Sequence, residues 1–177
     1  MRARTLAALA AATLLFTGCG STEPTGDAQQ PAADKAATLT VTDPWVKATK
    51  EGEMTGAFGK FTNDGDTDVT IVKATSAASP MLELHEVVMA DDGTMKMQPK
   101  EGGFVVPAGK SLTLEPGGLH IMFMGVAQDL NPGDEVTVTL EYSDGATQEI
   151  RALVKNFTGA NEKYAGKDKK KDKKAMH

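Results

Sequence analysis

Histidine and methionine residues recur at short intervals along the middle of this chain, and their side chains bind soft metal ions. The residues concerned are His85, Met89, Met95, Met97, His120, Met122 and Met124. Neutral imidazole and thioether sulfur suit Cu(I), whereas zinc, magnesium and calcium favour thiolate, carboxylate or carbonyl ligands. The pattern therefore predicts a copper site, provided that the fold brings these side chains together.

Residues 119–124 have the alternation of a half-buried β-strand. His120, Met122 and Met124 share one face, because side chains two residues apart in a strand point in the same direction. The aliphatic and aromatic residues between them take the opposite face. The metal-binding side chains of this segment are thus predicted to lie together on one side of a sheet.

Residues 81–98 are predicted to form a β-hairpin. Apolar residues precede the turn signal Asp91-Asp92-Gly93, and the two methionines at positions 95 and 97 follow it. Folding back across this turn brings Met97 near His85 and Val87, although the sequence does not fix the register. A hairpin and one further strand could therefore deliver two imidazoles and two or three thioethers to one place.

Each of these residues also has a purely structural interpretation. Methionine commonly fills gaps in protein cores, and a histidine in a strand is often a hydrogen-bonded polar residue. The joint pattern favours metal binding, because the chain has 3 His in total and two of them lie beside methionine at strand spacing. Met89 is the weakest candidate, since it adjoins the predicted turn.

Short predicted strands separated by turn signals indicate an all-β fold from about residue 38 to residue 158. The turn signals include Asn63-Asp64-Gly65, Pro107-Ala108-Gly109, Pro116-Gly117-Gly118, Asn131-Pro132-Gly133 and Ser143-Asp144-Gly145. Such spacing is typical of a Greek-key β-sandwich or barrel. A chain of 177 residues suits one such domain with tails.

The N-terminal residues predict export and membrane anchoring. Arg2 and Arg4 precede the apolar run 6–16, which is too short to span a bilayer as a helix. The string Leu-Phe-Thr-Gly-Cys that ends at Cys19 resembles the lipobox of bacterial lipoproteins. This resemblance implies that the signal peptide 1–18 is removed, that Cys19 is lipidated and that the protein lies on the extracytoplasmic face of the cell membrane. Residues 19–37 are poor in large apolar side chains and are predicted to form a flexible tether.

Composition excludes several other classes of protein. Cys19 is the only cysteine, so a disulfide framework and a blue-copper ligand set are both ruled out. A net charge of −5, few aromatic residues and no phosphate-binding glycine loop argue against a nucleic-acid partner. Since no nucleophile-elbow motif is present, we do not expect an enzyme.

The lysine-rich residues 159–177 are predicted to form a disordered tail, which could contact anionic lipid or an acidic partner. The tail ends in Met176 and His177, which are further candidate ligands. The sequence leaves open whether a second copper ion, as Cu(II), binds there.

Several motifs together resemble the periplasmic copper chaperone family called PCuAC. They are Leu84-His85-Glu86-Val87-Val88-Met89, Gly93-x-Met95-x-Met97, Val106-Pro107-Ala108-Gly109 and Pro116-Gly117-Gly118-Leu119-His120-Ile121-Met122. The resemblance extends from about Trp45 to Phe157, and the Pro-Gly-Gly-x-His-x-Met element is its most specific part.

This resemblance implies a cupredoxin-like β-sandwich that binds one Cu(I) through His85, Met97, His120 and Met122. It also implies delivery of copper to the CuA centre in subunit II of cytochrome c oxidase, or exchange with another copper chaperone. The interval between His85 and Met97 is one residue longer than is usual in the family, and Met95 therefore stays an alternative ligand.

Two other functions are compatible with the sequence. One is a β-sandwich interaction module whose methionines only pack, which would show no stoichiometric Cu(I) binding. The other is a copper storage or electron-transfer protein. An electron carrier with thiolate ligation would show a visible absorption band and would need a cysteine within the domain.

Overall fold

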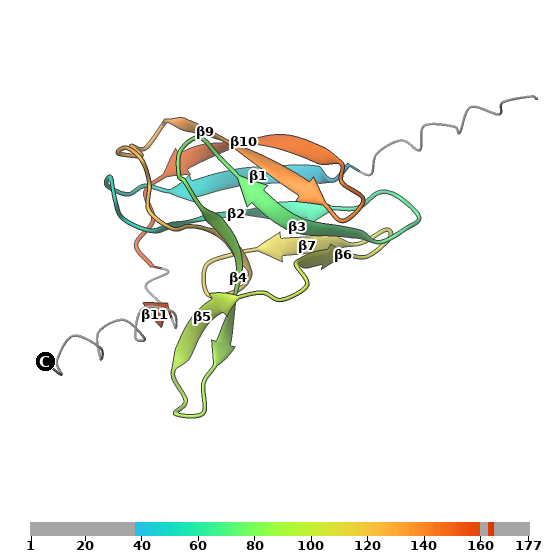
Figure 1. Cartoon of the computed structure of the whole chain (residues 1–177), viewed down its shortest axis with the longest axis horizontal. Helices are drawn as coiled ribbons and strands as arrows, with labels where there is room; N and C mark the ends of the chain where they lie inside the picture. The colour runs from blue at the N-terminus through green and yellow to red at the C-terminus, as the bar shows by residue number, and fades with distance from the viewer. Residues whose placement is uncertain (1–37, 160–162, 165–177) are drawn as a thin grey trace, which may run out of the picture. The chain divides into compact units, whose positions relative to one another are not determined.

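The computed structural model describes residues 38–159 and 163–164 of the chain (Figure 1). All regular elements in these ranges are β-strands, so the predicted all-β fold class is confirmed. The strands are β1 (Thr40–Lys47), β2 (Thr55–Thr62), β3 (Val69–Thr75), β4 (Leu82–Met89), β5 (Met95–Pro99), β6 (Phe104–Val106), β7 (Ser111–Leu114), β8 (His120–Phe123), β9 (Glu135–Tyr142), β10 (Thr147–Lys155) and β11 (Lys163–Tyr164). Over the same residues, no helix has the length and apolar character needed to cross a bilayer.

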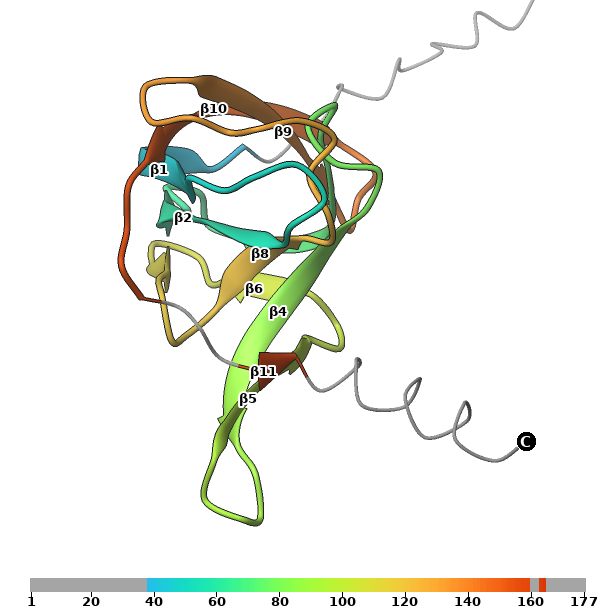
Figure 2. The same ribbon diagram turned by 90° about the vertical axis from the view of Figure 1, so that its left-hand side faces the viewer.

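The strands form one mixed sheet that curls until its two halves face each other. Its order is β11-β5-β4-β8-β2-β1-β10-β9-β3-β6, and β7 pairs with β2. The β1/β10 and β11/β5 pairs are parallel, and the other pairs are antiparallel. Figure 2 shows β9 and β10 in one layer and β2 and β8 in the layer opposite. The hairpin of β4 and β5 extends away from both layers.

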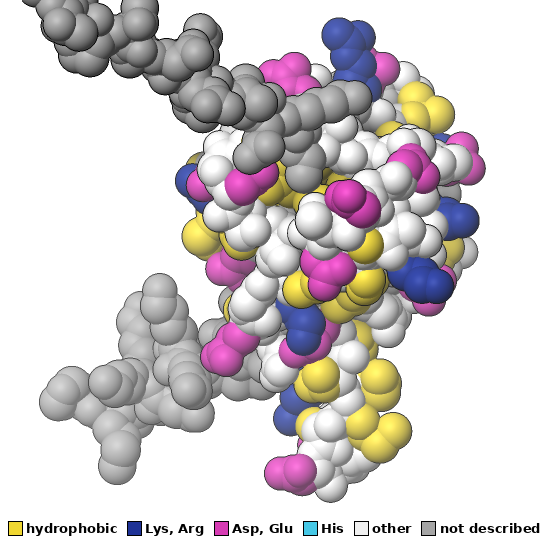
Figure 3. All heavy atoms as spheres, turned by 90° about the vertical axis from the view of Figure 1, so that its right-hand side faces the viewer, with side chains coloured by type: hydrophobic (Ala, Val, Ile, Leu, Met, Phe, Trp, Pro, Cys, Tyr) yellow, Lys and Arg dark blue, Asp and Glu magenta, His cyan; other side chains and the backbone are white. Residues whose placement is uncertain are grey.

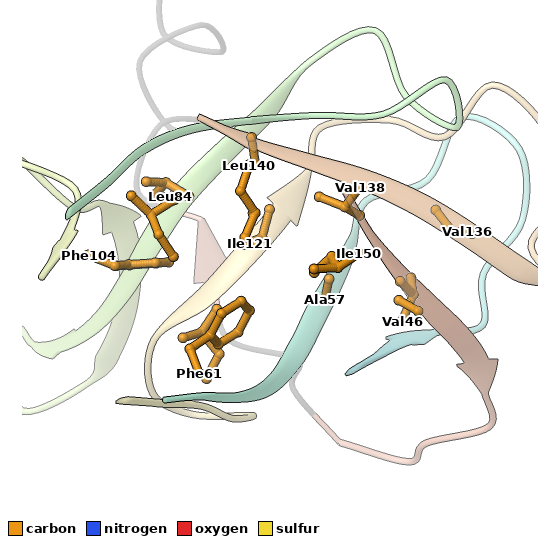
Figure 4. Packing of buried hydrophobic residues seen from close by; sticks show 14 of the residues in the cluster. Val46, Ala57, Phe61, Leu84, Phe104, Ile121, Val136, Val138, Leu140 and Ile150 are labelled. Atoms are coloured by element: carbon orange, nitrogen blue, oxygen red, sulfur yellow. The ribbon is translucent and has the colours of Figure 1, made fainter. Parts of the chain in front are cut away.

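The hydrophobic core fills the space between the two layers. Every second residue of the long strands points inward, as alternation predicts, and Figure 4 shows side chains from both layers meeting there. Ala57 and Ile121 come from one layer, and Leu140 and Ile150 come from the other. Full burial of a large aliphatic side chain contributes about 1.5–3 kcal/mol to the free energy of folding, so this core is a major source of the domain's stability.

A bulge interrupts β1 beside Pro44. The register between β1 and β2 shifts between Thr42 and Trp45, and Asp43 has a φ of 48°. Opposite the bulge, a Cβ added to Gly59 would lie 3.2 Å from the Pro44 Cα. The bulge therefore lets one continuous strand carry Trp45 onto the outer face of the sheet.

A partly buried side chain, Gln148, hydrogen-bonds the beginning of the domain to β10. The Gln148 Oε1 accepts a hydrogen bond from the Leu39 backbone N–H at 2.9 Å, and its Nε2 donates to the Leu39 carbonyl at 2.8 Å. The Tyr142 hydroxyl donates to the same Gln148 oxygen. Burial raises the pKa of Tyr142 above its ordinary value.

Candidate functional site

Two histidines lie side by side on the outer face of the sheet, opposite the core. His85 of β4 and His120 of β8 are register partners, and their ring centroids are 5.5 Å apart with an interplanar angle of 74°. Their chain neighbours Leu84 and Ile121 point into the core, which directs both imidazoles outward. Both histidines are nevertheless buried, at 0% and 5% exposure.

Each imidazole is oriented by a different hydrogen bond. The His85 Nε2 lies 2.7 Å from the Glu83 Oε2, and the His120 Nδ1 lies 3.0 Å from the Gly118 carbonyl oxygen. Because a carboxylate and a carbonyl only accept, the neutral rings donate through these nitrogens. The lone pair for a metal is then on Nδ1 of His85 and on Nε2 of His120.

The tight turn before β8 positions the acceptor for His120. Gly118 donates its backbone N–H to the Glu115 carbonyl at 3.0 Å, and Glu115 donates to the Leu119 carbonyl at 2.9 Å. Gly117 has a φ of 82°, a conformation that glycine adopts without strain. The Pro-Gly-Gly element thus fixes the carbonyl that selects the His120 tautomer.

A small cavity of about 50 Å³ adjoins His120. Its wall consists of Lys47, Met54, Thr55, Gly56, Phe58, Met97, Gly117, His120 and Met122. Met97 and Met122 are buried, at 5% and 6% exposure, and they come from strands on either side of β4. Since one water molecule occupies about 30 Å³ of liquid, the cavity has room for a single ion.

The Phe58 ring lines the cavity, and Trp45 and Phe157 pack in series behind it. The Phe58 ring lies 6.1 Å from the His120 ring, Trp45 lies 4.5 Å from Phe58, and Phe157 lies 5.4 Å from Trp45. Gly56 is the register partner of Met122, and a Cβ at Gly56 would come within 2.7 Å of the Phe58 ring. A glycine at this position therefore allows Phe58 to lie close to the sheet.

One positive charge belongs to the cavity wall. The Lys47 ammonium donates a hydrogen bond to the Gly159 carbonyl, and the Lys47 carbonyl accepts one from the Thr55 hydroxyl at 2.6 Å. The other groups here that could bind a metal ion are imidazole nitrogens and thioether sulfurs, together with the Glu83 carboxylate that orients His85. This set of atoms suits a soft monovalent ion.

The structure brings some of the predicted residues together and separates others. Met97 is the register partner of Val87, which confirms the predicted position of Met97 along the hairpin. Met95 and Met89 are exposed and do not line the cavity, and Met124 lines a different hollow beside Pro80. Cys19, Met176 and His177 lie outside the described residues, as do the predicted signal peptide and tether.

Sequence reasoning missed two residues of this site. Glu83 lies two residues before His85, and strand periodicity could have placed it on the same face. Met54 precedes β2 and reaches the cavity because β2 pairs with β8, a long-range contact that no local pattern indicates. Strand β11 was also not foreseen, because it falls in the range predicted to be a disordered tail.

Solved structures share this fold. The copper-bound PCuAC domain from PmoF2 superposes with a TM-score of 0.56 at 19% identity, covering 69% of this chain and 97% of that one. The solution structure of CuI-DR1885 from Deinococcus radiodurans gives a TM-score of 0.52 at 28% identity, covering 72% of this chain and 85% of that one. The PCuAC resemblance and the cupredoxin-like fold inferred from the sequence are thereby confirmed.

Sequence comparisons identify the family. A relative from Leifsonia xyli subsp. xyli, named "Putative lipoprotein Lxx21020", is 44% identical over 166 residues, which span 94% of this chain and 96% of the relative. The family model described as "Putative lipoprotein LpqE-like" matches residues 39–154, which run from the residue before β1 to the last residue but one of β10. The chain therefore belongs to the LpqE-like lipoprotein family.

Proposed function

We propose that this protein is an extracytoplasmic copper chaperone that carries one Cu(I) ion. His85, Met97, His120 and Met122 are the proposed ligands, and the recipient is a cuproprotein such as the CuA centre of cytochrome c oxidase, or another copper chaperone. The observation that carries the proposal is a small cavity bordered by His120, Met97 and Met122, with the His85 ring 5.5 Å from the His120 ring. Copper-bound relatives of the same fold support it.

The ligand set favours Cu(I) over Cu(II). The four proposed ligands are neutral, so none of them supplies the anionic charge that helps to stabilise a dication. The charges of Lys47 on the cavity wall and of Glu83 beside His85 are opposite in sign, so they do not add up to a preference for either oxidation state. Thioether sulfur is a soft ligand that stabilises the monovalent state. A second copper, as Cu(II), is not part of this proposal.

The position of Met97 suits release of the ion. Strand β5 is bordered by β4 and by the two-residue strand β11, so few backbone hydrogen bonds hold it on its outer side. Segments with few such bonds open locally at low free-energy cost. Movement of β5 would remove one thioether and expose the ion to an acceptor, which makes copper a cargo rather than a catalytic cofactor.

The family description supports membrane attachment. Both the matched family and the Leifsonia xyli relative are described as lipoproteins. We therefore propose that residues 1–18 are removed, that Cys19 carries the lipid anchor, and that the copper-binding domain lies outside the cytoplasmic membrane. The anchor would hold the chaperone near membrane-bound acceptors.

An anaerobic Cu(I) competition titration against a chromophoric chelator tests the proposal. Full-length wild type in detergent is compared with His120→Ala and Met122→Leu, and Met81→Leu serves as a control at an exposed methionine away from the cavity. Wild type and control are expected to bind one equivalent. Each site variant is expected to bind at least about tenfold more weakly, or about 1.4 kcal/mol. Absence of stoichiometric binding by wild type, or equal affinity in all proteins, would support the metal-free interaction module instead.

A further inference from the structure

Two methionines are exposed together near the end of the β4–β5 hairpin. Met89 is 73% exposed and Met95 is 46% exposed, and they are register partners across the hairpin. Figure 3 shows hydrophobic side chains gathered on this protruding part of the molecule. Single exposed apolar residues are common, but two facing methionines place two thioethers at one solvent-accessible position.

The hydrogen-bond pattern brings these two side chains close. Ala90 donates its backbone N–H to the Thr94 carbonyl at 2.8 Å, and Lys100 donates to the Leu84 carbonyl at 2.7 Å. Hydrogen-bonded and non-hydrogen-bonded pairs alternate along an antiparallel ladder, so Met89–Met95 is a non-hydrogen-bonded pair. In such pairs the Cα atoms are about 4.5 Å apart, and the side chains approach most closely.

The exposed pair lies on the same face as the buried ligand Met97. Met97 is two residues from Met95 along β5, a rise of about 7 Å, and pairs with Val87 rather than with another methionine. Methionine has a long, flexible side chain, so its sulfur can cover much of this interval. A row of thioethers thus runs from the hairpin end to the cavity.

We propose that Met89 and Met95 form a second, solvent-exposed Cu(I) site that exchanges the ion with Met97. This inference rests on the proposed function of the cavity and adds the route by which copper enters and leaves. Two thioethers without imidazole bind Cu(I) more weakly than the four-ligand site, so the ion stays only briefly. Asp91 and Asp92 at the turn outnumber the neighbouring Lys96, whose ammonium lies 3.9 Å from the Asp92 Oδ2, so the hairpin end keeps a net negative charge that attracts cations.

The direct test follows methionine methyl groups by NMR. Full-length protein in detergent, labelled with ¹³C at the methionine methyls, is titrated anaerobically with Cu(I) beyond one equivalent. The first equivalent is expected to shift Met97 and Met122, and the second is expected to shift Met89 and Met95 together. Met81, which is 50% exposed at the opposite end of β4, is the matched control and should not move.

A kinetic experiment tests the exchange. The double variant Met89→Leu/Met95→Leu keeps the apolar surface but removes both sulfurs. Its Kd for the first Cu(I) should stay within about twofold of wild type, whereas Cu(I) loading from the chelator complex should be at least fivefold slower; Met81→Leu should load at the wild-type rate. Unshifted Met89 and Met95 methyls, or wild-type loading by the double variant, would overturn the inference. Unshifted Met97 and Met122 methyls would instead overturn the proposed function.

Discussion

Strand β8 has two buried faces with different chemistry. Ile121 and Phe123 point into the core between the layers, whereas His120 and Met122 point to the outer face, and all four are nearly inaccessible to solvent. The inner pair packs against other apolar side chains, and the outer pair borders a small cavity that is also lined by Met54 and Met97. Burial alone therefore does not distinguish core from site here, whereas the cavity and the residue types around it do.

The largest expected effect is a difference in the free energy of unfolding between variants on the inner face and variants on the outer face of β8. Phe123→Ala should lower the free energy of unfolding by about 3–5 kcal/mol, because it leaves a cavity in the core. Met122→Leu should cost less than about 1.5 kcal/mol, because volume is conserved. Denaturant unfolding of the metal-free proteins measures both. Similar losses for the two variants would show that the outer face contributes to stability as much as the core does.

The next largest effect is expected on Cu(I) affinity and comes from Glu83, the carboxylate that hydrogen-bonds to His85. Glu83→Ala removes the acceptor that orients the imidazole, and losses of this kind typically weaken metal binding by about 10–100-fold. Glu83→Gln keeps an acceptor oxygen and should retain part of the affinity. Cu(I) competition titrations give the Kd values. If Glu83→Ala binds as wild type does, the hydrogen bond has no part in positioning His85.

A smaller effect is expected at Gly56, where the Phe58 ring lies close against the outer face of the sheet. Gly56→Ala places a methyl group against the Phe58 ring, and overpacking of this kind costs about 1–3 kcal/mol. The ring should shift away from His120 and disturb Trp45, the one tryptophan in the chain. Trp45 fluorescence should therefore change, and Cu(I) affinity should fall a few-fold. An unchanged emission spectrum would mean that Phe58 accommodates the methyl group without moving.

The smallest expected effect is a pH dependence of the free energy of unfolding, which arises from Tyr142 in β9. Burial raises the pKa of Tyr142, so above the ordinary tyrosine pKa of about 10 the unfolded chain loses this proton more readily than the folded one. The unfolded state then binds fewer protons, and the free energy of unfolding falls as pH rises. Below that pH this group gives no pH dependence. Tyr142→Phe should remove the alkaline loss seen in wild type; an identical pH profile in both proteins would contradict it.

The local features of the fold were predictable from sequence, whereas its long-range contacts were not. Alternation in residues 119–124 predicted which side chains of β8 share a face, and the turn at Asp91-Asp92-Gly93 predicted the hairpin. The packing of Trp45 and Phe58 next to His120, in contrast, depends on the pairing of β2 with β1 and with β8, which is far away in the chain. Local periodicity contains no information on such pairings, and the parallel β1/β10 contact was missed for the same reason.

The choice between Met95 and Met97 shows the same limit at the site. Both residues lie on one face of β5, so strand periodicity could not separate them. The structure separates them by depth, because Met97 lies beside the body of the sheet and Met95 lies toward the hairpin end. That difference depends on long-range contacts, because Met97 shares the cavity with residues of β2 and β8.

The position of β1 has a mechanical consequence. Although it is the first strand of the domain, β1 lies between β2 and β10, and Gln148 fastens its beginning at Leu39. A pulling force applied through the preceding residues acts along the strand, so the hydrogen bonds to both neighbours are loaded in shear rather than opened one by one. The domain should therefore withstand tension at its N-terminal end far better than tension that peels the β4–β5 hairpin from the sheet.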